Sequence, residues 1–334
     1  MPVSLGAPLA EWDEQQQLRG GLVVQLARHV ASSRGLALEL LPLPPARLRN
    51  EAAAGNFDAV CLPEAQRGPE RDLLDWAPPA FELNALLLAH VTSPRLERMA
   101  DLPADAVVGH VQGTNLAALD PGLADPRVRH EDALSEDRLA RKLLSRRHPY
   151  AVMSQPAASH WRAQSPDVAA WALPLEKTAL VCGLARRGPL SAGQWAEAQD
   201  QARRQGLLPQ WMHDARMPGF AMVVSRQHEA APLTEQQLND LFLARRGGTA
   251  NGGPLRLLML GGAWRADAIR QLLQREPGEY TAQWSGQQFG GRRRAPEEFD
   301  DPVQLRAALR QDPRALGVLP WWAVDASVRV LNFR

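Results

Sequence analysis

Two apolar runs decide the fold: FELNALLLAHV at residues 81–91 and TALVCGLA at residues 178–185. Each is suited to a long buried strand, and together they bracket a stretch with its own strand and helix patterns. Two such strands imply that the stretch between them is a second lobe inserted into the first. We therefore expect two α/β lobes joined by two strands, near Leu83–Ala89 and Thr178–Ala185, rather than a single continuous sheet.

The first 62 residues alternate short strand patterns with helix patterns. Apolar residues recur at helical spacing from Gly21, and Gly55 closes a second predicted helix at its C-terminal end. The rhythm predicts a parallel sheet. The expected strands are 3–6, 37–41 and 57–62, and the expected helices are 21–33 and 46–54.

The pattern restarts after Met217-Pro218-Gly219. Strand-like runs alternate with helical ones, and Thr234 with Gln237 forms a capping box at the start of the first helix. These residues predict a separate α/β domain. We expect a first lobe at residues 1–88 and 179–215, a second lobe at 89–178, and a C-terminal domain at 217–334.

Composition excludes several classes of protein. The formal net charge of the 334 residues is +1, which does not favour binding to nucleic acid or to an anionic membrane. No apolar run is long enough for a membrane helix. The first residues carry no signal-peptide pattern, yet Val3–Gly6 already resembles a strand. We interpret the chain as an exported protein trimmed to its mature start; a cytoplasmic protein is the alternative.

Two cysteines, Cys61 and Cys182, lie in apolar runs. No Cys-x-x-Cys motif and no Cys/His cluster with metal spacing is present, so no metal or other cofactor is expected. We favour two free, buried strand cysteines. A single disulfide between them is the alternative.

Residues 1–215 resemble the type II periplasmic binding proteins, in particular the branch that includes polar amino-acid binders. The resemblance rests on stretches in family order: Gly55-Asn56-Phe57-Asp58-Ala59, Leu74-Asp75-Trp76-Ala77-Pro78-Pro79, and Val107 to Thr114 after Asp101-Leu102. It implies a two-lobed "Venus flytrap" that closes on a small molecule.

Residues 217–334 look like one lobe of the phosphate-binding components of ABC transporters. The matching stretches are Leu238–Leu243, Gly252–Leu255, Phe289–Pro296 and Ala315–Leu319. The implied fold class is α/β: a two-lobed periplasmic binding protein of type II plus a single-lobe α/β domain.

Ligands of such folds meet strand ends and helix N-termini. A helix start offers free N–H groups to an anion, and Gly113-Thr114-Asn115 is such a place. Glu64 is placed to bind a cation or an amine; a solvated loop carboxylate is the alternative. Tryptophans near the cleft either stack on a ligand or pack the lobe. The candidate ligand-binding residues are Trp12, Glu64, Trp76, Phe81, Asn84, Gly113, Thr114, Asn115 and Gln155.

The positions at which the chain departs from the family pattern restrict the class of ligand that it can bind. Amino-acid binders place an arginine in the first crossing strand, where it pairs with the ligand carboxylate. Here Ala85 stands at that position, and the segment that would hold the ligand ammonium, Met153-Ser154-Gln155-Pro156, is neutral. We therefore expect ordinary α-amino acids to bind poorly.

The C-terminal domain also departs from its family. A Ser-Gly-Thr-like helix start that cradles phosphate is replaced by Gly261-Gly262-Ala263-Trp264-Arg265, which lacks the hydroxyls. We name Gly262, Trp264, Arg265 and Arg292 as candidate contacts for an anion or a partner. A solvated loop is the alternative for the arginine run at Arg292.

No catalytic motif is present: there is no Gly-x-Ser-x-Gly, no P-loop and no metal-binding His pair. We predict a non-catalytic periplasmic binding protein whose partners are a small-molecule ligand and a membrane permease or sensor. A sensory module that signals to a membrane kinase or cyclase is one alternative. A dehydratase-like enzyme on the same fold is the other.

Overall fold

The computed structural model describes most of the chain and separates it into two compact units. The N-terminal unit comprises Met1–Val168 and Leu175–Pro218, and the C-terminal unit comprises Ala169–Pro174 and Gly219–Arg334. The residues described are 4–13, 15, 17–215, 219–228, 233–246, 255–289, 293–325 and 327–333. No helix among them is long and apolar enough to cross a membrane.

The first lobe of the N-terminal unit is built around α1 (Leu22–Ser33). Seven residues of this helix are buried, at helical spacing, against a core that also holds Leu5, Phe81 and Trp195. The other elements are β1 (Glu11–Trp12), β2 (Leu18–Gly20), α2 (Leu48–Ala54), β3 (Ala59–Pro63), β4 (Leu74–Trp76), α6 (Ala192–Arg204) and α7 (Leu207–Asp214).

The second lobe is a parallel β-α arrangement. Its central strand β6 pairs in parallel with β7 on one side and with β8 on the other. Its elements are β6 (Val107–Val111), α3 (Leu116–Leu119), β7 (Arg129–Ala133), α4 (Glu136–Leu144), β8 (Tyr150–Ser154) and α5 (Gln155–Gln164). Short 3-10 turns in this unit are Pro45–Arg47, Glu64–Gln66, Pro69–Asp72, Met99–Asp101 and Pro121–Ala124.

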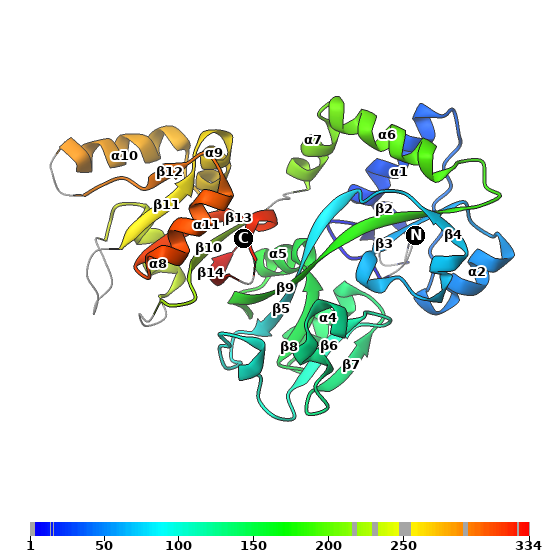
Figure 1. Ribbon diagram of the computed structural model, residues 1–334, viewed down its shortest axis with the longest axis horizontal. Helices are drawn as coiled ribbons and strands as arrows, with labels where there is room; N and C mark the ends of the chain where they lie inside the picture. Colours follow the sequence, from blue (N-terminus) through cyan, green and yellow to red (C-terminus); the bar gives the residue numbers. More distant parts are fainter. Residues whose placement is uncertain are drawn as a thin grey trace. The chain divides into compact units, whose positions relative to one another are not determined.

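Two long strands join the lobes, as the apolar runs predict. They are β5 (Phe81–His90) and β9 (Val168–Ala185), and Figure 1 shows them side by side. The hydrogen-bonded order is β3-β9-β5-β8-β6-β7, with β4 on β9. The expectation that no single sheet runs through the region is therefore wrong, because β5 and β9 pair with each other between the lobes.

The described residues of the first lobe do not form the parallel sheet that the sequence predicts. Ser4–Gly6 forms a turn and loop, and residues 37–41 pair with no strand among the described residues; Val3 lies outside them. Leu38 and Leu41 are 40% and 42% exposed. The strand that does form, β3, pairs antiparallel with β9. β9 therefore lies beside β3, at the position where the sequence predicts a parallel strand.

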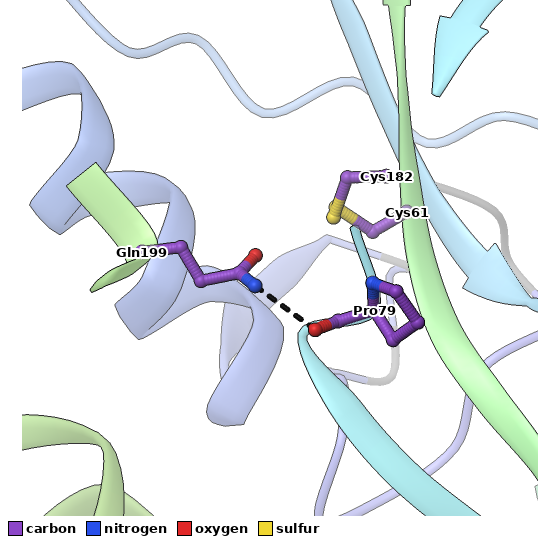
Figure 2. The surroundings of a disulfide bond; sticks show 4 residues. All are labelled: Cys61, Pro79, Cys182 and Gln199. Carbon is purple, nitrogen blue, oxygen red and sulfur yellow. Dashed lines mark hydrogen bonds between the residues drawn. A yellow bond between two sulfur atoms is a disulfide. The ribbon is translucent and has the colours of Figure 1, made fainter. Parts of the chain in front are cut away.

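A disulfide joins Cys61 and Cys182, so the free cysteines that we favoured are wrong. The two residues face each other directly in the β3–β9 register, and their Cα atoms are 4.0 Å apart. Figure 2 shows that Gln199 of α6 lies nearby; its amide donates to the Pro79 carbonyl oxygen at 2.9 Å. The disulfide holds β9 to β3 of the first lobe, and the Gln199 hydrogen bond holds the residues just before β5 to α6.

The C-terminal unit is an α/β domain with its own core. Its sheet order is β12-β11-β13-β10-β14; β10 is antiparallel to both neighbours, whereas β11 is parallel to β12 and β13. A 3-10 turn spans Trp321–Ala323. The elements are β10 (Phe220–Ser225), α8 (Glu235–Phe242), β11 (Arg256–Leu260), α9 (Gly262–Gln271), α10 (Pro277–Phe289), β12 (Glu297–Phe299), α11 (Pro302–Gln311), β13 (Ala315–Pro320) and β14 (Val328–Phe333).

Candidate functional site

The predicted helix start at Gly113-Thr114-Asn115 lies where the two lobes meet. Gly113 has φ +84°, which suits glycine. The Asn115 side chain caps α3, and its backbone N–H donates to the Ala65 carbonyl oxygen of the first lobe at 2.9 Å. Because α3 has only four residues, it offers a weak dipole to an anion. Here the turn bonds to protein instead.

A second contact between the lobes involves the chain's first described residues. Leu5 is buried in the core of the first lobe, and the Trp12 indole N–H donates to its carbonyl oxygen at 2.8 Å. The neighbouring Ser4 carbonyl oxygen accepts from the Glu136 backbone N–H at 3.2 Å. Since Glu136 begins α4, the N-terminal segment of the first lobe rests on a helix start of the second.

The Glu136 side chain is buried at this contact, with the residue only 3% exposed. One carboxyl oxygen, Oε1, accepts from the Ser154 backbone N–H at 2.7 Å. The Ser154 hydroxyl and the Gly6 backbone N–H are the other hydrogen-bonding groups beside this carboxyl. Burial raises the pKa of this carboxyl to about 7, although the N–H and hydroxyl of Ser154 and the N–H of Gly6 lower it. The group therefore titrates near neutral pH.

Asp137 adds a second carboxyl to the same contact. Burial raises the pKa of Asp137. The Trp161 indole N–H, which donates to Oδ1 at 3.3 Å, and the charges of His160 and Arg141 lower this pKa, but the effect of burial is larger. A methyl group built on Gly6 would lie 2.9 Å from this Oδ1. The absence of a side chain at Gly6 thus lets the two lobes approach.

The position of the missing arginine lies opposite the strand residue that bonds Glu136. Ala85 of β5 is directly opposite Ser154 of β8, whose N–H binds Glu136. Residues opposite each other in a sheet have Cβ atoms about 5 Å apart and share one face. The structure therefore places a methyl group, opposite Ser154, at the position where the family resemblance implies a guanidinium.

The aromatic candidates have packing roles in the first lobe. The Trp76 indole N–H donates to the Arg71 carbonyl oxygen at 2.9 Å, and the Arg67 guanidinium lies 5.2 Å from the ring centroid. Trp12 packs partly on the core, and Phe81 is buried inside it. Each of the three rings thus has packing or hydrogen-bonding partners within the first lobe.

The polar candidates divide between surface and interior. Glu64 is exposed and forms an ion pair with Arg67. Asn84, on β5, is buried, and so is Gln155, whose amide donates to the Ser159 hydroxyl at 3.0 Å. Gln155 directly follows Ser154, whose backbone N–H donates to Glu136.

In the C-terminal unit, the predicted contacts lie at the start of α9. Gly262 has φ +61°, and Trp264 is 37% exposed. The Arg265 guanidinium is 3.0 Å from Glu298 and donates to the Thr281 hydroxyl at 3.0 Å. Its charge is thus already matched by a carboxylate. Arg292 lies outside the described residues.

Sequence reasoning missed Ser4, Gly6, Glu136 and Asp137. The helix at Leu134–Leu144 was expected, but acidic residues in a first turn are ordinary partners of the helix dipole. Only the burial of Glu136 distinguishes it from a surface carboxylate, and burial depends on the distant N-terminal segment. Within the described part of the chain, no group of three or more His, Cys, Asp or Glu residues is arranged to hold a metal.

No protein-family profile matches the chain, and no curated protein matches it. Solved structures do. An ancestral amino acid-binding protein, described as a precursor of cyclohexadienyl dehydratase, has a TM-score of 0.54 at 17% identity over 63% of this chain and 91% of that chain. An amino acid ABC transporter substrate-binding protein from Streptococcus pneumoniae, bound to L-arginine, has a TM-score of 0.52 at 18% identity over 63% and 92%.

A histidine kinase sensor domain with similarity to periplasmic binding proteins has a TM-score of 0.51 at 16% identity, over 62% of this chain and 90% of that chain. At such identities the likeness shows the fold. The chain contains the two-lobed fold of the type II periplasmic binding proteins, with an additional C-terminal α/β unit.

Proposed function

We propose that this chain is a non-catalytic, exported solute-binding protein that closes on a small molecule between its two lobes. The contact of Ser4–Gly6 with α4 carries the proposal. It joins lobes that β5 and β9 alone connect covalently, and it buries the polar side chains of Glu136 and Ser154. Buried polar groups normally have partners. A ligand bound where the lobes meet would stabilise the closed arrangement.

The disulfide supports an oxidising compartment, which for a bacterial binding protein is the periplasm. Disulfides persist in exported proteins and are rare where cytosolic reductants keep thiols reduced. Cys61 and Cys182 are the chain's only cysteines, and both are in the bond. Localisation in the periplasm would bring the protein to a membrane permease or a membrane sensor.

The role of the bound state differs between uptake and signalling. The amino acid ABC transporter protein among the similar structures favours uptake, and the histidine kinase sensor domain favours signalling. We favour a signalling role for the additional C-terminal unit, at the Trp264 and Arg265 end of α9. Loss of partner binding or self-association in Trp264→Ala and Arg265→Glu would support this role. Tight phosphate binding by the chain, with unchanged association in both variants, would restore the transport interpretation.

A dehydratase-like enzyme is the second candidate, because a carboxyl with a pKa of about 7 is suited to proton transfer. The experiment that separates the two is a thermal-shift screen of amines, amino acids, organic acids and phosphate, followed by mass spectrometry of each stabilising compound. A ligand raises the melting temperature by binding the folded form. Recovery of the compound unchanged supports the binding protein; loss of water from it supports the enzyme.

A further inference from the structure

The C-terminal unit contains a pocket that the proposed function does not use. Its volume is about 650 Å³, which is in the range of small-molecule sites, and it lies between one face of α8 and the turn that follows α9. Leu243 and Leu273 form its apolar part, and both are buried, at 4% and 5% exposure. All of the lining residues lie within residues 235–275, so the pocket belongs to this unit alone.

Two arginines reach this pocket from turns at the ends of two helices. Arg245 directly follows Ala244, which has φ +55° after α8, and Arg275 directly follows Gln274, which has φ +54° after α9. Left-handed residues commonly end helices, and glycine is the usual one because it has no Cβ. Gln274 keeps a side chain at such a position, and it lines the pocket. The two turns therefore bring two cations and an amide to one site.

The protein itself matches only one of these two cations. The Arg245 guanidinium forms an ion pair with Asp240 of α8, at 3.6 Å. The Arg275 side chain is exposed, and it forms no ion pair or hydrogen bond within the described part of the chain. A guanidinium presents paired N–H donors that match a carboxylate. Arg275 is therefore available to an anionic group of a ligand.

Amide side chains supply most of the remaining polar lining, at Gln236, Asn239 and Gln274. Asn239 Oδ1 is buried and has no hydrogen-bond partner among the described residues. Rotation of this amide about its last side-chain bond exchanges its oxygen and its NH₂ group, so either can face the pocket. A hydroxyl both donates and accepts, and it can therefore bond to an amide in either orientation. The amides thus favour a ligand that is rich in hydroxyls.

The same groups discriminate against other classes of ligand. A phosphate ion offers few donors to the carboxylates of Glu235 and Asp240, and an amine would face the two guanidiniums. An uncharged sugar would leave Arg275 without a partner. None of the described residues that line the pocket is aromatic, so a flat aromatic ligand would find no ring to stack on. A carboxylate that also carries hydroxyls uses every kind of group present.

We propose that this pocket binds a small polyhydroxy carboxylate, the chemical class of the sugar acids. Its carboxylate pairs with Arg275, and its hydroxyls bond to Asn239 and the other amides. The lining residues all belong to the C-terminal unit, so this site differs from the one proposed between the two lobes. The proposal goes beyond the proposed function, and either can fail without the other.

The experiment is calorimetric titration of the full chain with D-gluconate and D-galacturonate, and with D-glucose, succinate and inorganic phosphate as contrasting probes. Glucose has hydroxyls but no carboxylate, whereas succinate and phosphate are anions without alcohol hydroxyls. Arg275→Gln removes the cation, and Asn239→Ala removes the amide. Arg310→Gln is the matched control, because Arg310 is an exposed arginine of α11 that does not line the pocket.

We expect at least one sugar acid to bind saturably and more tightly than glucose, succinate or phosphate. Its affinity should fall about tenfold or more in Arg275→Gln, because a charge-assisted pair is lost. It should also fall in Asn239→Ala and stay unchanged in Arg310→Gln. Sugar-acid binding that survives Arg275→Gln would overturn the site, since the ligand would then bind elsewhere in the chain. No binding of either sugar acid, or equal binding of succinate or phosphate, would overturn the ligand class and with it the proposal.

Discussion

Replacement of Glu136 by glutamine should make the protein more stable at alkaline pH. The carboxyl has its pKa raised from 4.5 to about 7 in the folded protein because it is buried. The folded state thus binds this proton more tightly than the unfolded state. The stabilisation is fully present below pH 4.5 and is lost as the pH rises through 7. Glutamine keeps an oxygen to accept the Ser154 N–H and has no proton to lose.

The size of the effect follows from the pKa difference. A rise of about 2.5 in pKa corresponds to about 3–4 kcal/mol, at about 1.4 kcal/mol for each unit of pKa. Between pH 4 and pH 8 the wild-type chain should lose about 3 kcal/mol of unfolding free energy that Glu136→Gln does not lose. Asp137 titrates in both proteins, so its contribution largely cancels in the comparison.

The assay is urea denaturation, followed by circular dichroism, at half-unit steps of pH between 4 and 8.5. Because the chain has two compact units, two transitions are expected, and the one that responds to reduction of the disulfide reports the N-terminal unit. Glu197 is an exposed carboxylate of α6, so Glu197→Gln should follow the wild-type curve. Parallel curves for the wild type and Glu136→Gln would refute the argument, since they would mean that Glu136 is solvated in the folded protein.

Three further changes test other parts of the account. Replacing Cys61 and Cys182 by alanine should lower the unfolding free energy by about 2–5 kcal/mol, because the bond closes a loop with a sequence separation of 121 residues; an unchanged denaturation midpoint would contradict the bond's role. Gly6→Ala should cost about 1–3 kcal/mol and abolish hydrogen-exchange protection of the Glu136 amide, since the new methyl group crowds α4; retained protection would show that the segments do not meet. L-Arginine and L-glutamine should give no saturable micromolar binding in calorimetry, because Ala85 cannot replace a bidentate guanidinium, and micromolar affinity for either would defeat this expectation.

The fold could be predicted largely from local pattern. The two apolar runs become β5 and β9, and the restart after residue 219 becomes a separate α/β unit, because long apolar runs and helical periodicity are local signals. Pairing could not be predicted in the same way. Residues 37–41 have a strand-like composition, yet β3 pairs with β9, a partner more than 100 residues away.

The site was less predictable than the fold because its character depends on burial. Thr114 and Asn115 were chosen for their place at a helix start, and the structure does bring that turn to the first lobe. Glu136 also lies at a helix start, where an acidic residue is common. What distinguishes it is the covering segment at Ser4–Gly6, and no local signal links residues that lie 130 positions apart. The cysteines lie 121 positions apart, so the sequence could offer their disulfide only as an alternative.

Closure of the two lobes on a small molecule is the central claim, and a distance between the lobes tests it most directly. Spin labels on Ala53→Cys in α2 and Arg129→Cys in β7 occupy exposed positions, one in each lobe. Pulsed electron paramagnetic resonance should show a longer or broader distance distribution for the free protein at pH 8.5, when Glu136 is charged. A saturating concentration of a compound that raises the melting temperature should narrow and shorten it. An identical distribution with and without every compound that raises the melting temperature would contradict the account.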